Sequence, residues 1–298
     1  MKLDTPPYIS VLMPVFNTEK FLVDSIESIL KQTLSDFEFI IVDDGSTDRS
    51  LDILRYFETR DPRVRLICRN NRGLVKTRNE LLEEAKGDVV VWADSDDISY
   101  PNRLECLIGL FRIDDALVWA GSAYRLIDPE GWPICVMGDP DSFGVGTAAM
   151  LRQMAIDVGG FREGLLVAED TDIGLRMQER GKITYLNEPL IDYRQHLGSV
   201  SNSFRQVVKA YATRVSQLAE ERRKFGKDAL HRGEDLEGIQ PGIAHRPEPE
   251  WQTYSRWAWW ALRAGNIVTA RKYALLAVRR KPISKDTWKV LACSIRGH

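Results

Sequence analysis

Short apolar runs alternate with amphipathic segments along the chain from Tyr8 to about Ala120. Each apolar run has the length of a β-strand, and each segment between two runs has apolar residues at helical spacing. The predicted strands span residues 9–13, 37–42, 64–68, 88–93 and 117–120, and the predicted helices span residues 20–32, 48–59, 74–85 and 101–113. This repeated alternation predicts a Rossmann-like α/β fold, in which helices cover both faces of a mostly parallel sheet.

The rest of the 298-residue chain lacks this regular alternation. Residues 124–146 are rich in Pro, Gly and Asp, which predicts irregular structure or short antiparallel strands. Further elements are predicted as a helix at 169–180, strands at 183–186 and 190–193, a charged helical stretch at 203–225, a linker at 226–250 and helices from 251 onward. We therefore expect an α/β domain at 1–202 and a helical C-terminal region at 203–298, with the linker around 226–250.

The C-terminal region has the small-residue spacing of one tetratricopeptide-type helical hairpin, at Ala258, Gly265, Ala270, Ala277 and Pro282. A single such unit cannot bury a core alone. We expect a helical appendage packed on the main domain, with apolar area supplied by Trp257, Trp259, Trp260 and Trp288. This Trp-rich region could also bury against a second copy, as a homo-oligomer.

The same region is basic, with Arg271, Lys272, Arg279, Arg280, Lys281, Lys285, Lys289 and Arg296 against a lone Asp286. Two interpretations stay open. The basic residues could make peripheral contact with anionic lipid, where each is worth about 1 kcal/mol. They could also form a solvated helix face.

Composition excludes several other classes of protein. A formal net charge of −2 argues against nucleic-acid binding. The four cysteines are scattered and form no C-x-x-C pair, which argues against structural zinc and a disulfide framework. No apolar run reaches bilayer-spanning length, and residues 1–7 lack the apolar core of a signal peptide. A cytoplasmic protein is expected, at the inner face of the membrane if the basic region contacts lipid.

Acidic side chains follow two of the predicted strands directly. Asp94 and Asp96 come after the apolar run at 89–93, and Asp43 and Asp44 come after the run at 37–42. In α/β sheets of this kind, ligands bind beyond the carboxyl ends of the strands. Carboxylates two residues apart on a turn can share one hard cation, and that cation can hold a diphosphate. The sequence therefore predicts a site for a nucleotide and its metal ion.

An ordered series of motifs runs through residues 8–202. It comprises the segment 9–17, Gln32 and Thr33 before the segment 37–48, then Gly73, Arg78 and Asn79, then Asp94 to Asp97 as a D-x-D motif, then Glu169, Asp170, Ile173 and Arg176, and finally Tyr193, Arg194, Gln195, His196, Ser199 and Ser201. The series resembles the inverting family-two glycosyltransferases with the GT-A fold, with Ile173 where that family usually has Leu.

The resemblance implies nucleotide-binding roles for several residues. Asp44 is expected to accept a hydrogen bond from a uracil N–H, and its neighbour Asp43 to buttress the loop or reach the ribose. Pro14 and Phe16 could line the base, which needs an apolar wall, although ordinary core packing would also explain Phe16. Arg78 could hold the diphosphate or nucleoside, because a guanidinium matches phosphate geometry.

Arg78 and its neighbour also have structural interpretations. A surface salt bridge from Arg78 to Glu80 or Glu84 is the alternative to diphosphate binding. Asn79 is expected to order its loop.

Metal binding is expected at Asp94 and Asp96, with Asp96 the direct ligand, as is usual in the family. A solvated acidic turn is the alternative. The expected ion is Mn²⁺ or Mg²⁺, and Mn²⁺ is favoured if His196 joins the site, because the ligands would then be mixed oxygen and imidazole. His196 has an ordinary structural role as its alternative.

Asp170 is the candidate general base. Direct displacement at an anomeric carbon requires the acceptor hydroxyl to lose its proton, and a carboxylate at a helix start should be kept ionised by the helix dipole. The alternative for Asp170 is an N-cap, a role that Thr171 or Asp172 could also fill. Glu169 would shape the acceptor site. Only one such carboxylate is evident, so a double displacement lacks a nucleophile.

The predicted function is therefore metal-dependent transfer of a hexosyl group from a UDP-sugar to an acceptor hydroxyl, with inversion. The acceptor would be a saccharide or a lipid-linked saccharide, in surface polysaccharide or glycoconjugate synthesis. Trp92, Trp119 and residues 121–149 are candidates for recognising the donor sugar.

Three other functions were weighed against glycosyl transfer. A sugar nucleotidyltransferase usually has a Gly-rich, basic loop after its first strand, whereas residues 14–18 contain neither Gly nor Arg. A signalling receiver domain would leave Asp96 and Asp170 unexplained. A catalytically silent nucleotide-binding protein is disfavoured by the same two residues.

Overall fold

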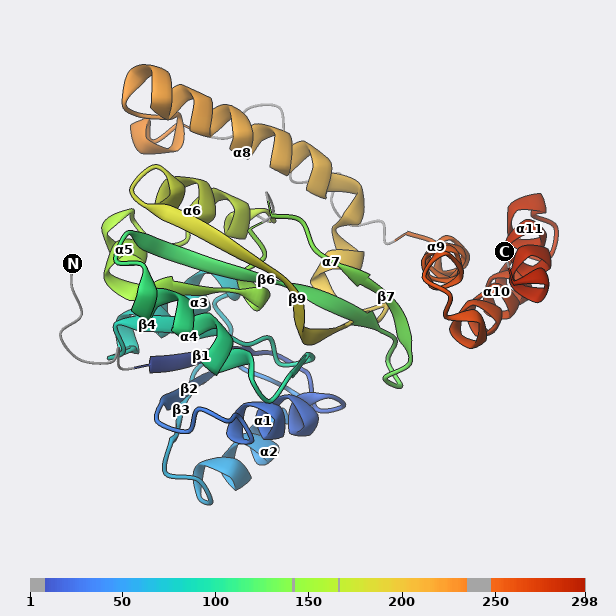
Figure 1. The fold of residues 1–298 in the computed structure, drawn as a ribbon, viewed down its shortest axis with the longest axis horizontal. Coiled ribbons are helices and arrows are strands. Elements are labelled where there is room, and N and C mark those ends of the chain that lie inside the picture. Colours follow the sequence, from blue (N-terminus) through green and yellow to red (C-terminus); the bar gives the residue numbers. More distant parts are fainter. Residues whose placement is uncertain (1–8, 141–142, 166, 235–247, 298) are drawn as a thin grey trace. The chain divides into compact units, whose positions relative to one another are not determined.

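The computed structural model describes residues 9–140, 143–165, 167–234 and 248–297 (Figure 1). The chain divides into two compact units. The first unit comprises Met1–Ala123, Gly138–Ile191 and Tyr211–Leu236, and the second comprises Tyr124–Met137, Asp192–Ala210 and Glu237–His298. The division predicted at residues 202 and 203 stays a proposal.

Within the described residues, nine strands form one sheet in the order β3-β2-β1-β4-β8-β6-β9-β5, with β7 paired to β6. They are β1 (Ile9–Val15), β2 (Glu38–Asp43), β3 (Val64–Cys68), β4 (Val89–Trp92), β5 (Ile98–Ser99), β6 (Leu117–Ile127), β7 (Pro133–Met137), β8 (Ala149–Leu151) and β9 (Lys182–Arg194). Strand β1 pairs in parallel with both β2 and β4, and β2 pairs in parallel with β3. The carboxyl ends of β1, β2 and β4 therefore meet at one edge of the sheet.

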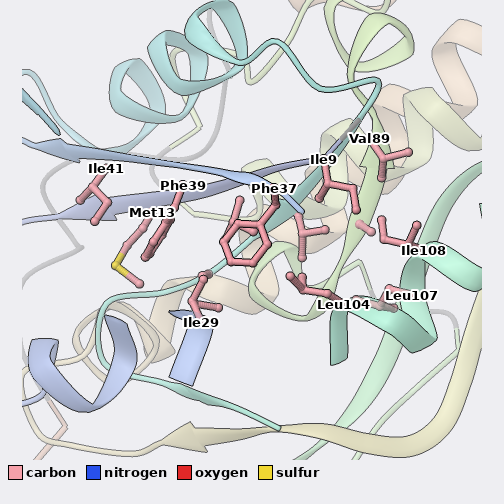
Figure 2. Close-up of a cluster of buried hydrophobic side chains, with 14 of the residues drawn as sticks. Ile9, Met13, Ile29, Phe37, Phe39, Ile41, Val89, Leu104, Leu107 and Ile108 are labelled. Atoms are coloured by element: carbon pink, nitrogen blue, oxygen red, sulfur yellow. The ribbon is translucent and has the colours of Figure 1, made fainter. Parts of the chain in front are cut away.

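The first unit has helices on both faces of this sheet. Alternate strand residues point to opposite sides, so each face presents apolar side chains that the helices cover. Its helices are α1 (Leu22–Leu30), α2 (Ser50–Glu58), α3 (Leu74–Glu84), α4 (Arg103–Ile113), α5 (Arg152–Asp157) and α6 (Glu169–Gln178). Figure 2 shows one face, where strand residues such as Met13 and Phe39 pack with Ile29 of α1 and Leu104 of α4. The predicted α/β fold class is confirmed.

The other face is built from the intervening strand residues. Leu12, Ile40 and Trp92 belong to a second core cluster together with Leu81 of α3 and Ile173 of α6. Helix α6, which carries the proposed catalytic carboxylate, is thus anchored on the sheet through its apolar side.

The second unit contains a helical hairpin formed by α9 (Glu250–Arg263) and α10 (Ile267–Arg280), followed by α11 (Lys285–Arg296). Gly265, at φ 78°, makes the turn between the first two helices in a backbone region that favours glycine. Trp257 is buried against Tyr273, with ring centroids 5.0 Å apart, and the cluster includes Leu126 of β6 and Ile134 of β7.

The expected helical hairpin is confirmed, but one tryptophan of the following helix α11 is not buried as predicted. Trp288 is 52% exposed, so the prediction that it supplies buried apolar area is wrong. Helix α11 buries its Thr287, Val290, Leu291 and Ser294 side instead.

Several predicted boundaries differ from the structure. Residues 183–193 belong to one strand, β9, rather than two, and no glycine interrupts this stretch. The charged helical stretch is α7 (Val200–Ser203) and α8 (Arg205–Phe225).

Part of the predicted linker lies within the described residues. Residues 228–232 form a short turn that includes the 3₁₀ helix η2 (Leu230–Arg232), in which Asp228 is fully buried. Residues 235–247 of the predicted linker lie outside the described residues. No described helix is both long enough and apolar enough to cross a bilayer.

Candidate active site

The loops that follow β1 and β2 are tied together by Asn17. Its backbone has φ 54°, a left-handed conformation that Asn tolerates better than most residues. The side-chain oxygen of Asn17 accepts a hydrogen bond from the Thr47 N–H at 2.7 Å, and the Asn17 N–H donates to Ser46 Oγ at 3.0 Å. These bonds fix the loop that carries Phe16 relative to the loop that carries Asp44.

Asp44 is buried and holds the start of α3. Its carboxylate accepts hydrogen bonds from the backbone N–H groups of Arg72 at 2.7 Å and Gly73 at 2.9 Å, and from the Arg69 guanidinium. A carboxylate has about four lone-pair positions, so capacity for another donor remains. Recognition of uracil by Asp44 stays a prediction.

Three other residues at the ends of β1 and β2 bear on the nucleotide-binding predictions. Asp43 Oδ2 accepts from the Ser46 N–H at 3.3 Å, which fits the predicted role of buttressing the loop. Phe16 is 48% exposed at the end of β1, so its alternative interpretation as a core residue is wrong. Pro14 is half-buried in the same strand. A role for Pro14 and Phe16 against a base stays a prediction.

Arg78 connects the two acidic segments. Its buried guanidinium donates to Glu169 Oε1 at the start of α6, and it lies 3.9 Å from Asp94 Oδ1. The alternative of a surface salt bridge is wrong, because Glu80 pairs with Arg69 and Glu84 with Arg65. Residues from three distant parts of the chain therefore meet at this arginine.

Asn79, the next residue, orders a loop as predicted. Its amide nitrogen donates to the Phe161 carbonyl at 2.8 Å, and its amide oxygen accepts from the Phe161 N–H at 2.8 Å. The Phe161 ring in turn lies 5.5 Å from the Arg78 guanidinium. Asn79 therefore holds the segment whose Phe161 ring packs beside Arg78.

Asp94 and Asp96 concentrate negative charge at the end of β4. Burial raises the pKa of Asp94; the charges of Asp96 and Glu169 also raise it, while Arg78 and Arg103 lower it. A Cβ atom at Gly146, in the 3₁₀ turn η1 (Val145–Thr147), would collide with Asp94 Oδ2. Both aspartates are half-buried, so their oxygens are neither fully covered nor free in solvent.

Arg103 supports this loop from below and was missed by sequence reasoning. It is 1% exposed, and it donates to the carbonyls of Trp92 at 2.7 Å and Gly146 at 2.8 Å and to Ser99 Oγ at 2.8 Å. Burial lowers its pKa to about 10, although Asp94 and Asp97 oppose this. The sequence does contain a signal for the burial of Arg103, because this cation lies on the apolar face of α4, one turn before Leu107.

Asp170 lies in the first turn of α6, after Ala168 in a left-handed conformation at φ 64°. Burial raises the pKa of Asp170 to about 7; the Glu169 charge also raises it, and Arg78 and hydrogen bonds from Thr171 lower it. The expectation that the helix dipole keeps this group firmly ionised is therefore wrong. The N-cap alternative is wrong as well, because Ala168 occupies that position and no side chain caps the helix.

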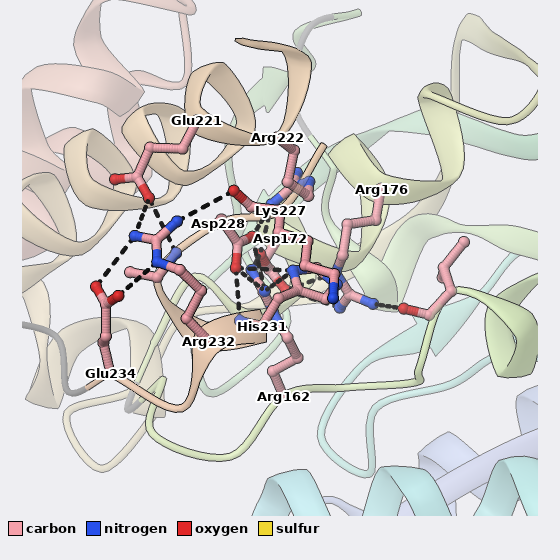
Figure 3. Close-up of polar contacts among 12 residues, drawn as sticks. Arg162, Asp172, Arg176, Glu221, Arg222, Lys227, Asp228, His231, Arg232 and Glu234 are labelled. Carbon is pink, nitrogen blue, oxygen red and sulfur yellow. Dashed lines mark hydrogen bonds and ion pairs between the residues drawn. The ribbon is translucent and has the colours of Figure 1, made fainter. Parts of the chain in front are cut away.

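A buried network of charges anchors α6 from behind (Figure 3). Asp172 is fully buried and accepts from Arg162 at 2.9 Å and from Arg176 at 2.7 Å. Asp228 is also fully buried and accepts from Arg162 at 2.8 Å and from Arg222 of α8 at 2.6 Å. Burial alone would raise the pKa of Asp228, but these hydrogen bonds hold it well below its usual range.

His196 belongs to the second unit, where its carbonyl accepts from the Asn202 amide at 2.6 Å. Its role as a metal ligand stays a prediction. In the part of the chain that the structure describes, no group of three or more His, Cys, Asp or Glu side chains is arranged to hold a metal ion. An ion at Asp94 and Asp96 would therefore need oxygen ligands from a bound substrate, as Mg²⁺ sites often do.

Comparison with known proteins identifies the family. Residues 10–158, half of the 298-residue chain, match the family described as Glycosyl transferase family 2. The chain is an α/β enzyme with the GT-A fold, and it belongs to glycosyl transferase family 2.

Two relatives illustrate the sequence similarity. "Glycosyltransferase GlyG" of Streptococcus pneumoniae is 29% identical over 239 residues, which cover 70% of this chain and 79% of that protein. "Chondroitin synthase" of Escherichia coli is 32% identical over 215 residues, which cover 67% of this chain but only 30% of that protein.

Two solved structures illustrate the similarity in fold. The structure of Staphylococcus aureus TarS residues 1–349 with UDP-GlcNAc has a TM-score of 0.58 at 19% identity, covering 98% of this chain and 92% of that one. The mannosyltransferase PcManGT of Pyrobaculum calidifontis, with GDP-Man and Mn²⁺, has a TM-score of 0.58 at 16% identity, covering 99% of this chain and 86% of that one.

Replacing Arg103 should destabilise the fold. Arg103→Met leaves the Trp92 and Gly146 carbonyls without their donor in a buried place, which should lower the free energy of unfolding by about 3–5 kcal/mol. Urea unfolding measures this. Arg112→Met, at an exposed position of the same helix, is the control and should change stability by less than about 0.5 kcal/mol. Equal effects of the two changes would contradict the supporting role of Arg103.

Replacing Asp170 should stabilise the protein at alkaline pH. Because the folded-state pKa of about 7 lies above the value of 3.8 for an unperturbed aspartate, the ionised form is disfavoured in the fold, and stability is lost as pH rises toward 7. Asp170→Asn should therefore raise the free energy of unfolding by about 1–3 kcal/mol at a pH of about 8, and by less at a pH of about 5.

The control for this measurement is Asp52→Asn. Asp52 also lies in the first turn of a helix, but it is exposed. Its replacement should remove only a favourable helix-dipole interaction, so it should not stabilise the protein at either pH. A stability difference for Asp170→Asn that does not depend on pH would argue against a raised pKa.

Proposed function

We propose that this glycosyltransferase moves a sugar from a UDP-sugar to an acceptor hydroxyl, with inversion at the anomeric carbon and with the help of a divalent metal ion. The observation that carries the proposal is the Arg78 contact with both Asp94 and Glu169. That contact brings the D-x-D segment and the carboxylates of α6 to one place at the carboxyl ends of the strands. Both parts are needed, because the leaving diphosphate and the attacking hydroxyl flank the same carbon atom.

The donor is proposed to bind at the ends of β1 and β2. The exposed ring of Phe16 is available as a wall for a flat base, and Asp44 retains acceptor capacity for a base N–H. The TarS structure with UDP-GlcNAc supports a uridine donor, although the PcManGT structure contains GDP-Man. The choice of uracil therefore rests on Asp44.

Asp96 and Asp94 are the residues that would hold the metal ion. They fit the ion, because they supply hard oxygen ligands and because a cation would offset the burial and the Asp96 and Glu169 charges that raise the pKa of Asp94. A bound Mn²⁺ or Mg²⁺ supplies Lewis-acid stabilisation of negative charge on the leaving diphosphate. The Mn²⁺ in the PcManGT structure supports the same assignment.

Asp170 is proposed as the general base. The acceptor oxygen forms its bond to the anomeric carbon as the bond from that carbon to the diphosphate breaks, and the hydroxyl proton passes to Asp170. A base with a pKa of about 7 suits this step, because about half of it is ionised at neutral pH and the ionised form binds a proton well. Glu169 is held by Arg78 and is proposed to shape the acceptor site rather than to react.

The acceptor is proposed to be a saccharide, free or lipid-linked, in polysaccharide or glycoconjugate synthesis. Relatives described as chondroitin synthase and as "Hyaluronan synthase" of Pasteurella multocida support this class. This chain spans only 30% and 20% of those proteins, so the assignment is made from the shared domain alone. The hexosyl character of the donor and a cytoplasmic location are part of the same proposal.

Asp96→Ala should weaken metal-dependent UDP binding. Removal of the carboxylate leaves the ion with fewer ligands, so UDP affinity in Mn²⁺ should fall toward the affinity measured with chelator. Calorimetry of UDP binding with and without Mn²⁺ measures the difference. Asp88→Asn, at an exposed position before β4, is the control and should bind UDP normally. Unchanged metal-dependent affinity in Asp96→Ala would exclude Asp96 as a ligand.

Asp170→Asn should abolish transfer but retain UDP binding. Positioned general bases contribute about 10²–10⁴-fold, so turnover on a transferable UDP-sugar should fall by that factor. In the unmodified enzyme, kcat/KM should decline as pH falls below about 7, because Asp170 becomes protonated. Retained turnover would show that another group is the base, and parallel loss of UDP binding would show that Asp170 acts in binding.

A further inference from the structure

Helix α11 exposes a stripe on which basic and apolar side chains alternate. Lys285, Trp288, Lys289, Ala292, Ile295 and Arg296 are exposed and follow helical spacing on the side opposite the buried residues. Trp288 is 52% exposed and Ile295 is 62% exposed. Asp286, the only acidic residue of this helix, lies outside the stripe by helical spacing.

Helix α10 exposes a second stripe of the same kind. Val268, Arg271, Leu275 and Arg279 recur every three or four residues, and all four are exposed. The Arg271 guanidinium donates to the carbonyls of Ser294 at 3.1 Å and Ile295 at 3.2 Å. The α10 stripe therefore meets the α11 stripe at this end of the helix pair, and Ile283, in the loop between the two helices, is 88% exposed. We call the two stripes and Ile283 the basic–apolar face.

The structure sorts the basic residues of this region into two groups. Lys272 pairs with Asp128 and Glu130, Arg280 pairs with Glu250, and the Lys281 ammonium lies 4.3 Å from the centre of the Trp251 ring. In contrast, Arg279, Lys285, Lys289 and Arg296 have no ion-pair partner among the described residues, and all four lie on the basic–apolar face. The cations without internal partners are thus gathered beside large exposed apolar side chains.

We propose that the basic–apolar face docks on the surface of a lipid bilayer that contains anionic headgroups. Interfacial helices combine Trp, Leu and Ile with flanking Lys and Arg, whose long side chains reach the headgroups while the apolar groups enter the interface. The face offers both components in alternation. The inference does not depend on the proposed donor or base, and it would bring the enzyme to a lipid-linked acceptor.

A second copy of the chain fits this face less well. An isologous contact places the same residues opposite one another, so the cations of one copy would face those of the other without an acidic complement. An acidic protein partner would pair with the cations, but its acidic groups would not cover the exposed apolar side chains of Ile283, Trp288 and Ile295. Anionic lipid satisfies both the charge and the apolar side chains.

Co-sedimentation of the full chain with vesicles tests this inference. The protein should bind vesicles of phosphatidylcholine mixed with phosphatidylglycerol, should not bind phosphatidylcholine alone, and should be released by high salt. Lys285→Glu combined with Lys289→Glu should lower partitioning by roughly 25-fold or more, since each basic residue near such a surface contributes about fivefold. Trp288→Ala combined with Ile295→Ser should lower it while leaving the charge unchanged.

The matched control is Lys86→Glu combined with Lys224→Glu, which makes the same change in charge at exposed positions of the first unit and should leave partitioning unchanged. Circular dichroism checks that each variant is folded, and hydrolysis of a UDP-sugar in the absence of vesicles should be equal in all of them. Absence of binding to anionic vesicles at low salt would overturn the inference. An equal loss of vesicle partitioning in the control variant would also overturn it. So would a protein that does not bind vesicles but self-associates, if the Lys285 and Lys289 changes abolish that self-association.

Discussion

The arrangement of the candidate active site depends on one buried cation. Arg78 lies between Asp94, which follows β4, and Glu169, which begins α6. Without a positive charge at this point, these carboxylates and the neighbouring Asp96 and Asp170 would repel one another in a partly buried place. Their ionised forms would then be disfavoured, and the two segments would be pushed apart. The arginine makes it possible for the protein to hold so many acidic groups together before any substrate or metal ion is bound.

Arginines also hold both sides of the site from behind. Arg103 fixes the carbonyls of Trp92 and Gly146 beneath the D-x-D loop. On the other side, Arg176 bonds Asp172 of α6 and the carbonyls of Val158 and Gly160, which fixes the helix relative to the loop before it. A guanidinium suits this work because its several donors lie in one plane and can satisfy carbonyl and carboxylate groups from different segments at once. The network thus fixes the backbone around the half-buried carboxylates of Asp94, Asp96 and Asp170.

The sequence predicted the fold more completely than it predicted the site. Strand β3 and the start of α3 were predicted at their observed residues, because apolar periodicity is a local signal that a buried sheet enforces. Motif order also placed Asp44, Arg78, Asp96 and Asp170 in one unit. What could not be predicted was how these residues pair. In the sequence, Arg103 has the pattern of an ordinary helix residue and Arg69 that of a strand-end residue. Their observed contacts are made with distant residues, such as Gly146, which is 43 positions from Arg103.

The pKa of Asp170 was misjudged for a similar physical reason. From the sequence, the helix terminus and the neighbouring Glu169 are visible, whereas burial, which has the largest effect on this pKa, depends on the tertiary structure. The same limit applies to the C-terminal region, where the sequence listed the cations but could not separate those with internal partners from those on the basic–apolar face.

The start of α6 contains two energetically unfavourable features, which the contacts of a neighbouring residue offset. Ala168 occupies a left-handed backbone conformation that costs about 1 kcal/mol for a residue with a Cβ atom, and Asp170 is ionised at neutral pH only against the effect of burial. Neither feature would persist if the first turn of the helix could relax. The buried contacts of Asp172 with Arg162 and Arg176, one turn away, prevent this relaxation. The fold can therefore tolerate Asp170 with a raised pKa, because Asp172 in the same helix turn is held by ion pairs with Arg162 and Arg176.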